Sequence, residues 1–393
     1  MRTFFHGCPV FTGERTVTDA GVLVEDGRVL DLAPQPPAGA AEVVLASDSL
    51  LAPGFVDTQV NGGGGVLFNE TPTAAGALAI AAAHRRFGTT ALLPTFITDA
   101  AGTWRRAVDA AAEAARMPGG GVIGIHLEGP FLNMERRGVH EAAYVRAPTD
   151  EDVAFLLGLP ARFAGGRVLL TLAPEVVDDC ILARLADAGL ILAGGHSAAS
   201  FARTRGALDH GLTGFTHLFN AMPPLMNREP GIAGAALADT RGWCGVIADG
   251  VHVHGAMLRL ALAAKGPERL FLVTDAMPPT GTDADRFELY GQTIHRRNGR
   301  LETADGVLAG ADIDMAAAVR GAMGLMGVSR ETALAMASKV PADFLGLPDV
   351  GRIAPGARAD LVELSPDLAV RRVWMRGGET PLPELAYDKD GRG

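Results

Sequence analysis

The sequence predicts an α/β protein: a (β/α)8 TIM-like barrel with a small β domain formed from both chain ends. From about residue 51 onward, apolar runs that end in polar or glycine-rich loops alternate with helical segments, which is the pattern of parallel strands joined by helices. Eight such runs occur, and strand-rich segments flank them on both sides. We expect residues 1–50 and 349–380 to form the small β domain and residues 51–348 to form the barrel.

Length and composition fit one large barrel. The chain has 393 residues, 48% of them hydrophobic, so a sizeable core can be buried. The net charge of −10 argues against nucleic acid or an anionic membrane as a partner. No uncharged apolar run of about 18 residues occurs, so no transmembrane helix is predicted. The three cysteines form no CxxC pair, and we expect a cytoplasmic protein.

The first 50 residues predict short strands and turns. Asp26-Gly27 separates two apolar runs within residues 20–30, a pattern typical of a β-hairpin. No helix signal occurs in this part of the chain. We therefore expect it to contribute strands to the small domain.

The barrel strands are expected to end near eight positions: Gln59, Thr95, His126, Ala173, His196, His217, Asp249 and Asp275. Amphipathic, Ala-rich segments predict the helices between them, at residues 73–87, 101–116, 150–163, 178–188, 198–210 and 255–264. The helix after the sixth strand has a poor signal because Pro223, Pro224 and Pro230 interrupt it.

The chain after Asp275 predicts an insertion and then a return to the small domain. Residues 287–308 look strand-like, with Asn298-Gly299 as a hairpin turn. Two helical segments follow, at residues 313–326 and 329–345. A second block of short strands begins near Gly351.

Potential metal ligands stand at the predicted strand ends, where barrels of this kind carry their catalytic residues. Carboxylate and imidazole side chains at these ends come from several different strands. One carboxylate and two histidines would form a ligand set for zinc or iron with an open position for water. Asp275 follows an apolar run. It is either a buried structural acceptor or a general base beside a metal-bound water.

Six short motifs occur in a fixed order: PGFVD at 53–57, HLEGP at 126–130, GHS at 195–197, THLFNAM at 216–222, ADGVH at 248–252 and VTDA at 273–276. Together they resemble the N-acetylglucosamine-6-phosphate deacetylases of the amidohydrolase superfamily, over residues 50 to 365. The resemblance implies hydrolysis of the acetamide of N-acetyl-D-glucosamine 6-phosphate to glucosamine 6-phosphate and acetate, in amino-sugar catabolism or recycling.

The resemblance also implies residue roles. The implied metal ligands are Glu128, His196 and His217. Asp275 is implied as the general base and then the acid, and His140 as the group that polarises the acetamide carbonyl.

By the same resemblance, the sugar phosphate is held by Asn220, Ala221, Arg228 and His252. In relatives an arginine at this place can reach the neighbouring subunit's site, so we expect a homodimer. The only other partner expected is the small amino-sugar phosphate itself.

Two departures from the superfamily pattern bear on these expectations. Gln59-Val60-Asn61 stands where two-metal members carry His-x-His. We therefore expect one divalent metal per chain, zinc in the first place and iron in the second. The second departure is residues 310–315, GADIDM, where relatives are more often Ser-rich. It leaves the choice among related sugar phosphates open.

Two alternatives remain. One is another amidohydrolase-superfamily C–N hydrolase that acts on a related N-acyl substrate, although the run THLFNAM is not explained by it. The other is a non-catalytic barrel that serves as a scaffold. Loss of a ligand or of Asp275 would favour the scaffold, and none is lost.

Overall fold

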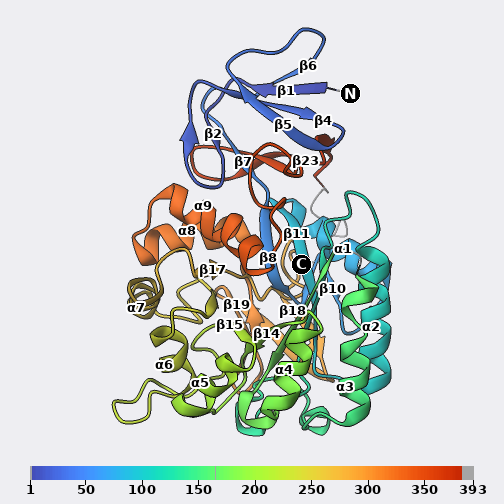
Figure 1. Ribbon diagram of the computed structural model, residues 1–393, viewed down its shortest axis with the longest axis vertical. Coiled ribbons are helices and arrows are strands. Elements are labelled where there is room, and N and C mark those ends of the chain that lie inside the picture. Colours follow the sequence, from blue (N-terminus) through green and yellow to red (C-terminus); the bar gives the residue numbers. More distant parts are fainter. Residues whose placement is uncertain (1, 164, 383–393) are drawn as a thin grey trace, which may run out of the picture.

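Eight parallel strands form the centre of the molecule in the computed structural model, which describes residues 2–163 and 165–382 (Figure 1). These strands are β8 (Phe55–Val60), β11 (Thr89–Ile97), β12 (Gly124–Glu128), β13 (Arg167–Leu172), β14 (Ile191–Gly194), β15 (Leu212–Phe215), β16 (Trp243–Val246) and β17 (Leu270–Leu272). Each pairs with the next in chain order. The predicted barrel is confirmed, and every predicted strand end lies within three residues of the observed one.

The first and last strands meet through their C-terminal ends. The backbone N–H of Asp275 donates to Gln59 O at 3.0 Å, and that of Asn61 donates to Ala276 O at 2.9 Å. Deeper in this seam, the hydroxyl of Thr274 donates to Asp57 Oδ2 at 2.5 Å, and both side chains are fully buried. Hydrogen bonds beyond the regular ladder therefore hold β8 beside β17.

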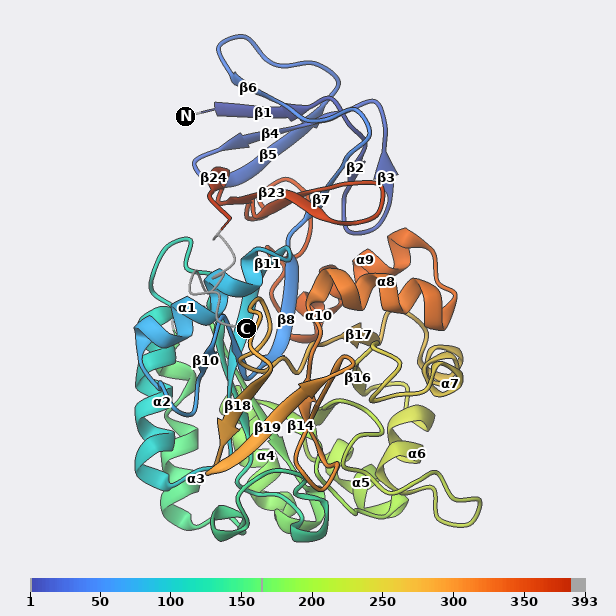
Figure 2. The ribbon, with the colours of Figure 1, turned by 180° about the vertical axis from the view of Figure 1, so that it is seen from behind.

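Helices cover the outside of the barrel (Figures 1 and 2). They are α1 (Ala74–Arg85), α2 (Ala101–Ala114), α3 (Asp150–Leu157), α4 (Asp179–Asp187), α5 (Phe201–Asp209), α6 (Gly231–Ala238), α7 (Gly255–Lys265), α8 (Met315–Met326), α9 (Arg330–Ala337) and α10 (Lys339–Phe344). Short 3-10 turns are η1 (Met134–Arg136), η2 (Ala142–Tyr144), η3 (Pro160–Arg162) and η4 (Pro174–Val176). Among the described residues, none of the helices is both long and apolar enough to cross a membrane.

Prolines explain where the helices differ from the prediction. The segment 329–345 is two helices because Pro341 lacks an N–H and its ring would clash with the carbonyl of Ala337, where α9 ends. The helix predicted over 150–163 ends at Leu157 and is followed by η3, which begins at Pro160. The poorly signalled sixth helix does form, and it begins directly after Pro230.

Both chain ends build the small domain, drawn in blue and red above the barrel (Figure 2). Its strands are β1 (Arg2–His6), β2 (Val10–Phe11), β3 (Thr16–Val17), β4 (Gly21–Glu25), β5 (Arg28–Ala33), β6 (Ala41–Val44), β7 (Leu50–Pro53), β22 (Leu361–Leu364), β23 (Val370–Met375) and β24 (Gly378–Thr380). The two ends share one sheet of order β24-β23-β22-β7-β2-β3. The hairpin at Asp26-Gly27 joins β4 to β5 as predicted.

A separate sheet lies beside the C-terminal end of the barrel. It contains β18 (Arg286–Leu289), β19 (Gln292–Arg297), β20 (Arg300–Glu302) and β21 (Leu308–Ala311), and a two-stranded ribbon, β9 (Gly62–Gly63) and β10 (Val66–Leu67), forms nearby. The predicted turn at Asn298-Gly299 is confirmed, since both residues have positive φ angles and join β19 to β20. Apolar residues of this sheet pack against Ile97 and Met277, which fixes the sheet to the barrel.

Candidate active site

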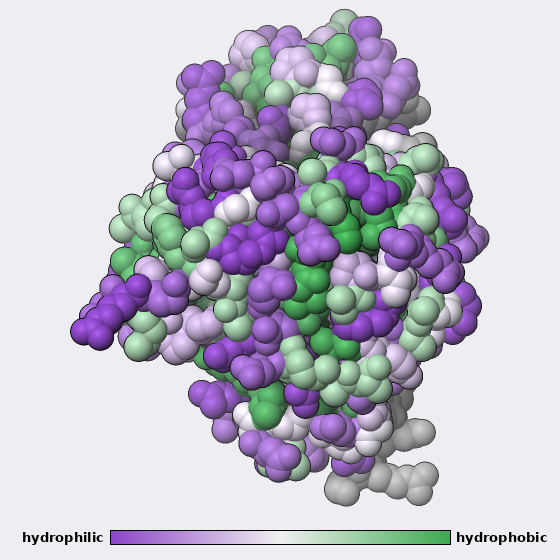
Figure 3. All heavy atoms as spheres, turned by 60° about the horizontal axis from the view of Figure 1, so that its bottom comes forward, coloured by the Kyte–Doolittle hydropathy of each residue, from purple (hydrophilic) through white to green (hydrophobic). Residues whose placement is uncertain are grey.

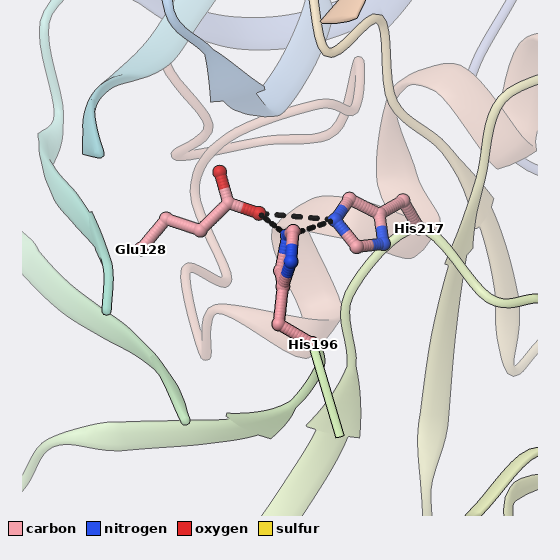
Figure 4. Close-up of side chains that lie close together, drawn as sticks. All are labelled: Glu128, His196 and His217. Carbon is pink, nitrogen blue, oxygen red and sulfur yellow. Dashed lines mark hydrogen bonds and ion pairs between the residues drawn. The ribbon is translucent and has the colours of Figure 1, made fainter. Parts of the chain in front are cut away.

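A carboxylate and two imidazoles meet at the C-terminal end of the barrel (Figure 4). Glu128 is the last residue of β12, and His196 and His217 follow β14 and β15 by two residues. Glu128 Oε1 lies 3.2 Å from His196 Nε2 and 3.0 Å from His217 Nε2, and the two Nε2 atoms are 3.1 Å apart. All three side chains are buried. The structure thus brings together the three residues predicted as metal ligands.

The chemistry of these donors fits a divalent metal ion. Ligand atoms about 2.0–2.2 Å from a tetrahedral metal stand roughly 3.3–3.6 Å from one another, close to the separations found here. His196 Nδ1 lies 2.9 Å from the carbonyl oxygen of Arg136. Because a carbonyl only accepts, Nδ1 carries the proton and Nε2 keeps its lone pair for a metal. Burial alone would raise the pKa of Glu128, but the two imidazoles hold that pKa well below its ordinary value.

Three of the strand-end residues have left-handed backbones. The φ angles are 48° for His196, 30° for His217 and 51° for Asp275. Side chains other than glycine rarely adopt this conformation, which is costly unless the surroundings enforce it. Here the sharp turn after each strand aims the two imidazoles at Glu128 (Figure 4).

Asp275 is held by amide groups from the neighbouring strand. Its Oδ1 accepts from Asn61 Nδ2 at 2.6 Å and from Gln59 Nε2 at 3.1 Å. The same Gln59 nitrogen lies 3.1 Å from Glu128 Oε1. Burial, followed by the charge of Glu128, raises the pKa of Asp275 to about 6. A carboxyl group with this pKa can both take and give a proton near neutral pH.

His140 lies in the loop after β12 and is buried beside His196, with ring centroids 4.5 Å apart. Burial, followed by the charge of His196, lowers its pKa to about 3, so the imidazole is neutral. Its Nδ1 lies 2.8 Å from Thr98 Oγ1 and 3.4 Å from the Thr98 backbone nitrogen. In the tautomer in which Nδ1 accepts these bonds, Nε2 carries the proton and can donate to a substrate oxygen.

His126, the histidine of the HLEGP motif, makes contacts in the barrel interior instead. Its ring nitrogens lie 3.1 Å from Thr95 Oγ1 and 2.8 Å from Thr171 Oγ1. Burial lowers its pKa to about 4. Both nitrogens are therefore occupied, and the residue does not join the ligand group.

Most of the predicted site residues share one cavity of about 490 Å³. Eight of the nine predicted site residues line it: Glu128, His140, His196, His217, Asn220, Ala221, His252 and Asp275. The face at this end of the barrel shows a hydrophobic band between polar regions (Figure 3). The structure thus brings to one place eight residues that the sequence predicted as metal ligands, catalytic groups and substrate contacts.

Arg228 is the predicted site residue that stands apart. It is exposed on the loop between β15 and α6, and it does not line the cavity within the described part of one chain. Leu225 and Met226 on the same loop are 36% and 58% exposed. The loop therefore presents a cation and two apolar side chains outward.

Arg136 is a residue that sequence reasoning missed. Arg136 lines the cavity, and its backbone carbonyl accepts from His196. No ion-pair partner of Arg136 occurs within residues 2–163 and 165–382. The available signal was a basic pair, Arg136-Arg137, between HLEGP and the Gly-Val-His that ends at His140.

The unusual segment 310–315 turns its acidic side chains away from the cavity. Asp312 accepts from Arg296 Nε at 2.7 Å, and Asp314 caps α8 by accepting from the backbone of Ala317 at 2.8 Å. Gly310 is the residue of this segment that lines the cavity. The two aspartates therefore have structural partners of their own.

The amidohydrolase family model matches residues 50–392, which include every part of the site. The chain therefore belongs to the amidohydrolase family. Within that family it is similar to deacetylases of N-acetylated amino-sugar phosphates. N-acetylgalactosamine-6-phosphate deacetylase of Shewanella sp. (strain ANA-3) is 44% identical over 346 residues, covering 88% of this chain and 85% of that protein.

Solved structures show the same fold. The N-acetylglucosamine-6-phosphate deacetylase of Pasteurella multocida has 30% identity and a TM-score of 0.92, covering 97% of this chain and 100% of the other. A mutant of the Mycobacterium smegmatis deacetylase, solved in complex with N-acetyl-D-glucosamine-6-phosphate, has 36% identity and a TM-score of 0.87, covering 96% and 98%.

Proposed function

We propose that this chain is a metal-dependent deacetylase that hydrolyses N-acetyl-D-glucosamine 6-phosphate to glucosamine 6-phosphate and acetate. The observation that carries the proposal is a single cavity in which a Glu/His/His ligand set, a buried carboxylate and a buried neutral imidazole face the same space. A relative with the same fold binds this sugar phosphate. Removal of the acetyl group is a step of amino-sugar catabolism.

Different residues of the site would carry out different steps of amide hydrolysis. The reaction needs a base for the attacking water, a donor for the carbonyl oxygen and an acid for the leaving amine. A divalent ion, when bound, supplies Lewis acidity that polarises the carbonyl and makes water more acidic. Asp275 would take a proton from the water and return it to the amine nitrogen as the C–N bond breaks. His140 would donate a hydrogen bond from Nε2–H to the acetamide oxygen and so polarise the carbonyl.

We infer one metal ion per chain. Imidazole and carboxylate ligands favour zinc, with iron as the second choice. The amides of Gln59 and Asn61 donate to carboxylates, and an amide nitrogen offers no lone pair to a metal. These contacts support a single ion held by Glu128, His196 and His217.

The 6-phosphate needs positive charge in an acidic protein. Asn220, Ala221 and His252 line the cavity together with Arg136. Arg228 would add a bidentate guanidinium from the neighbouring subunit, since its own chain keeps it outside the cavity. The exposed Leu225 and Met226 beside it support a homodimer built around this loop.

A second candidate substrate is N-acetyl-D-galactosamine 6-phosphate. The Shewanella relative, at 44% identity, carries the name of that activity. The two sugars differ only in the orientation of the C4 hydroxyl, and C4 is two ring atoms away from C2, which bears the acetamide. The same site chemistry would serve both.

An acetate-release assay tests the proposal. It should compare N-acetylglucosamine and N-acetylgalactosamine, each with and without the 6-phosphate. We expect the phosphorylated sugars to react with far higher kcat/KM, and the ratio between the two epimers assigns the substrate. Turnover only of unrelated N-acyl compounds would indicate a different amidohydrolase. A complete lack of turnover by metal-loaded protein would favour the scaffold.

We place the protein in the cytoplasm. Cys8, Cys180 and Cys244 are all free thiols. Proteins of oxidising compartments usually pair their cysteines, whereas cytosolic proteins keep them reduced. The thiols therefore support a reducing compartment, where sugar phosphates are also retained.

A further inference from the structure

Behind His252 lies a buried carboxylate that no role described so far uses. Asp249 Oδ2 lies 2.6 Å from His252 Nδ1, and the two side chains are 9% and 6% exposed. The other carboxylate oxygen, Oδ1, accepts from the backbone N–H groups of Val251 and His252 at 2.8 and 2.9 Å. Asp249 therefore fixes both the loop and the ring.

His252 borders the cavity, and the ring nitrogen opposite Nδ1 has no partner in the described part of the chain. His252 lines the 490 Å³ cavity. Its Nε2 is buried and has no hydrogen-bond partner among the described residues. A buried polar atom without a partner is costly, and a ligand oxygen in the cavity would supply that partner.

A purely structural role for Asp249 would need only one of its oxygens. A carboxylate that accepts from backbone N–H groups two and three residues later is a common local turn, and Oδ1 alone makes it. The second oxygen contacts the imidazole of a residue that lines the cavity and whose far nitrogen has no partner among the described residues. Burial alone would raise the pKa of Asp249, but its bond to His252 and the charge of that ring lower the pKa instead.

We propose that Asp249 is a positioning residue for substrate recognition. It holds the proton on His252 Nδ1 and turns Nε2 toward the cavity, where the ring meets an anionic oxygen of the substrate. The assignment rests on the proposed function, in which that oxygen belongs to the 6-phosphate.

The test is a double-mutant cycle with Asp249→Asn and His252→Ala. Asn keeps the oxygen for the backbone turn but offers an NH2 group to Nδ1, which removes the charge behind the ring. Asp249→Asn should raise KM for the 6-phosphate sugar by about ten- to a hundredfold, with kcat changed less than about threefold. KM for the unphosphorylated sugar should stay the same. On the His252→Ala background, Asp249→Asn should add almost nothing.

Asp312→Asn is the matched control, because Asp312 is also a buried aspartate in a 2.7 Å contact with a cation but does not line the cavity. It should leave KM for both sugars unchanged. Equal losses on both sugars from Asp249→Asn, or full additivity with His252→Ala, would overturn the proposal.

A measurement on the unaltered metal-loaded protein is independent of turnover and of folding defects. ¹⁵N NMR of the imidazoles should show a protonated Nδ1 on His252, and titration with inorganic phosphate should perturb its Nε2. A bare Nδ1 would refute the positioning role. If the NMR result holds but neither sugar phosphate is hydrolysed, the proposed function fails and the positioning of His252 stands.

Discussion

The two sides of the barrel mouth carry different chemistry on equivalent strand ends. On one side, the ends of β12, β14 and β15 present a carboxylate and two imidazoles whose ligand atoms lie 3.0–3.2 Å apart. On the other side, β8 presents the amides of Gln59 and Asn61, and β17 leads to Asp275. The first side therefore presents nitrogen and oxygen lone pairs, whereas the second presents amide N–H donors that surround the Asp275 carboxylate.

In the proposed mechanism, this difference separates cation binding from proton transfer. Imidazole lone pairs can bind a metal, whereas an amide NH2 can only donate. Gln59 joins the two sides because its Nε2 lies 3.1 Å from both Glu128 Oε1 and Asp275 Oδ1. Changes on the two sides should therefore impair the protein in different ways.

The largest effect is expected on the metal side. His196→Asn should lose metal and activity together, because Asn cannot offer the aromatic nitrogen that faces Glu128. Elemental analysis and acetate release would be measured on the same preparation. His210→Asn is the control, since that ring is 44% exposed and lies outside the site. Stoichiometric metal in the His196 variant would contradict the ligand assignment, and two tightly bound ions in active wild-type protein would contradict a single metal.

On the other side, Asp275→Asn should separate chemistry from binding. Asn has nearly the size of Asp but is no base, so kcat should fall by at least about 10²–10⁴, with KM changed far less. Metal content and thermal melting should stay near those of the wild type. Near-normal turnover would mean that another residue is the base. Parallel loss of metal would make Asp275 a ligand instead.

Neither of these two sides offers a cationic side chain to the 6-phosphate of the substrate. Arg228→Ala should therefore weaken substrate binding and leave the chemical step unaffected. Loss of a charge-assisted contact of about 1.5–4 kcal/mol should raise KM for the 6-phosphate sugar by roughly ten- to a thousandfold. The unphosphorylated sugar should be affected much less. Arg105→Ala, which breaks a surface pair with Glu151 and a contact with the Phe155 ring far from the site, should affect neither. Equal losses on both sugars would refute the assignment. A fully active monomer at assay concentration would remove the inferred dimer.

A smaller effect should follow from Asn61→Ala. The variant removes the 2.6 Å bond to Asp275 Oδ1 but leaves the bond from Gln59. Loss of one hydrogen bond to a charged group, about 1.5 kcal/mol, would lower kcat about tenfold. Metal content should not change. A drop in bound metal in step with kcat would show that the two sides are not separate.

The smallest effect concerns stability at the seam between β8 and β17, where Asp57 accepts from Thr274. Burial raises the pKa of Asp57 to about 7, above its value of about 3.9 in an unfolded chain. The folded state therefore binds this proton more tightly, so stability falls as the pH rises from about 4 to about 7 and then levels off. Asp57→Asn mimics the protonated acid and should remove this part of the pH dependence. Urea unfolding at pH 5 and pH 8 would show it, and an unchanged pH dependence would exclude Asp57 as its source.

Periodicity predicted the barrel because each buried strand is a nearly continuous apolar run with a polar or glycine-rich end. The same ends predicted where Glu128, His196, His217 and Asp275 would meet. Local patterns also predicted the turns at Asp26-Gly27 and Asn298-Gly299, where positive φ angles select the residues.

What the sequence did not predict depends on contacts between distant segments. Arg136 lines the cavity because the loop after β12 folds back, with the backbone N–H of Asn133 donating to the carbonyl of His196 at 2.9 Å. No periodic pattern marks such a loop. The predicted role of Arg228, a contact with the substrate of a neighbouring subunit, cannot be seen in a single chain. The Asp249–His252 pair did have a local signal, since a spacing of three residues around a glycine is enough to place a carboxylate beside a ring.

The sheet shared by both chain ends has a consequence for synthesis on the ribosome. β7 ends at Pro53, and its partner β22 begins at Leu361. Phe5 meets Trp374 at 5.2 Å between ring centroids. At about 5–20 residues per second, on the order of 15–60 s pass between translation of these segments. During that interval the N-terminal strands have an unpaired edge and exposed apolar side chains, so the nascent chain is most vulnerable to misassociation before its last strands emerge.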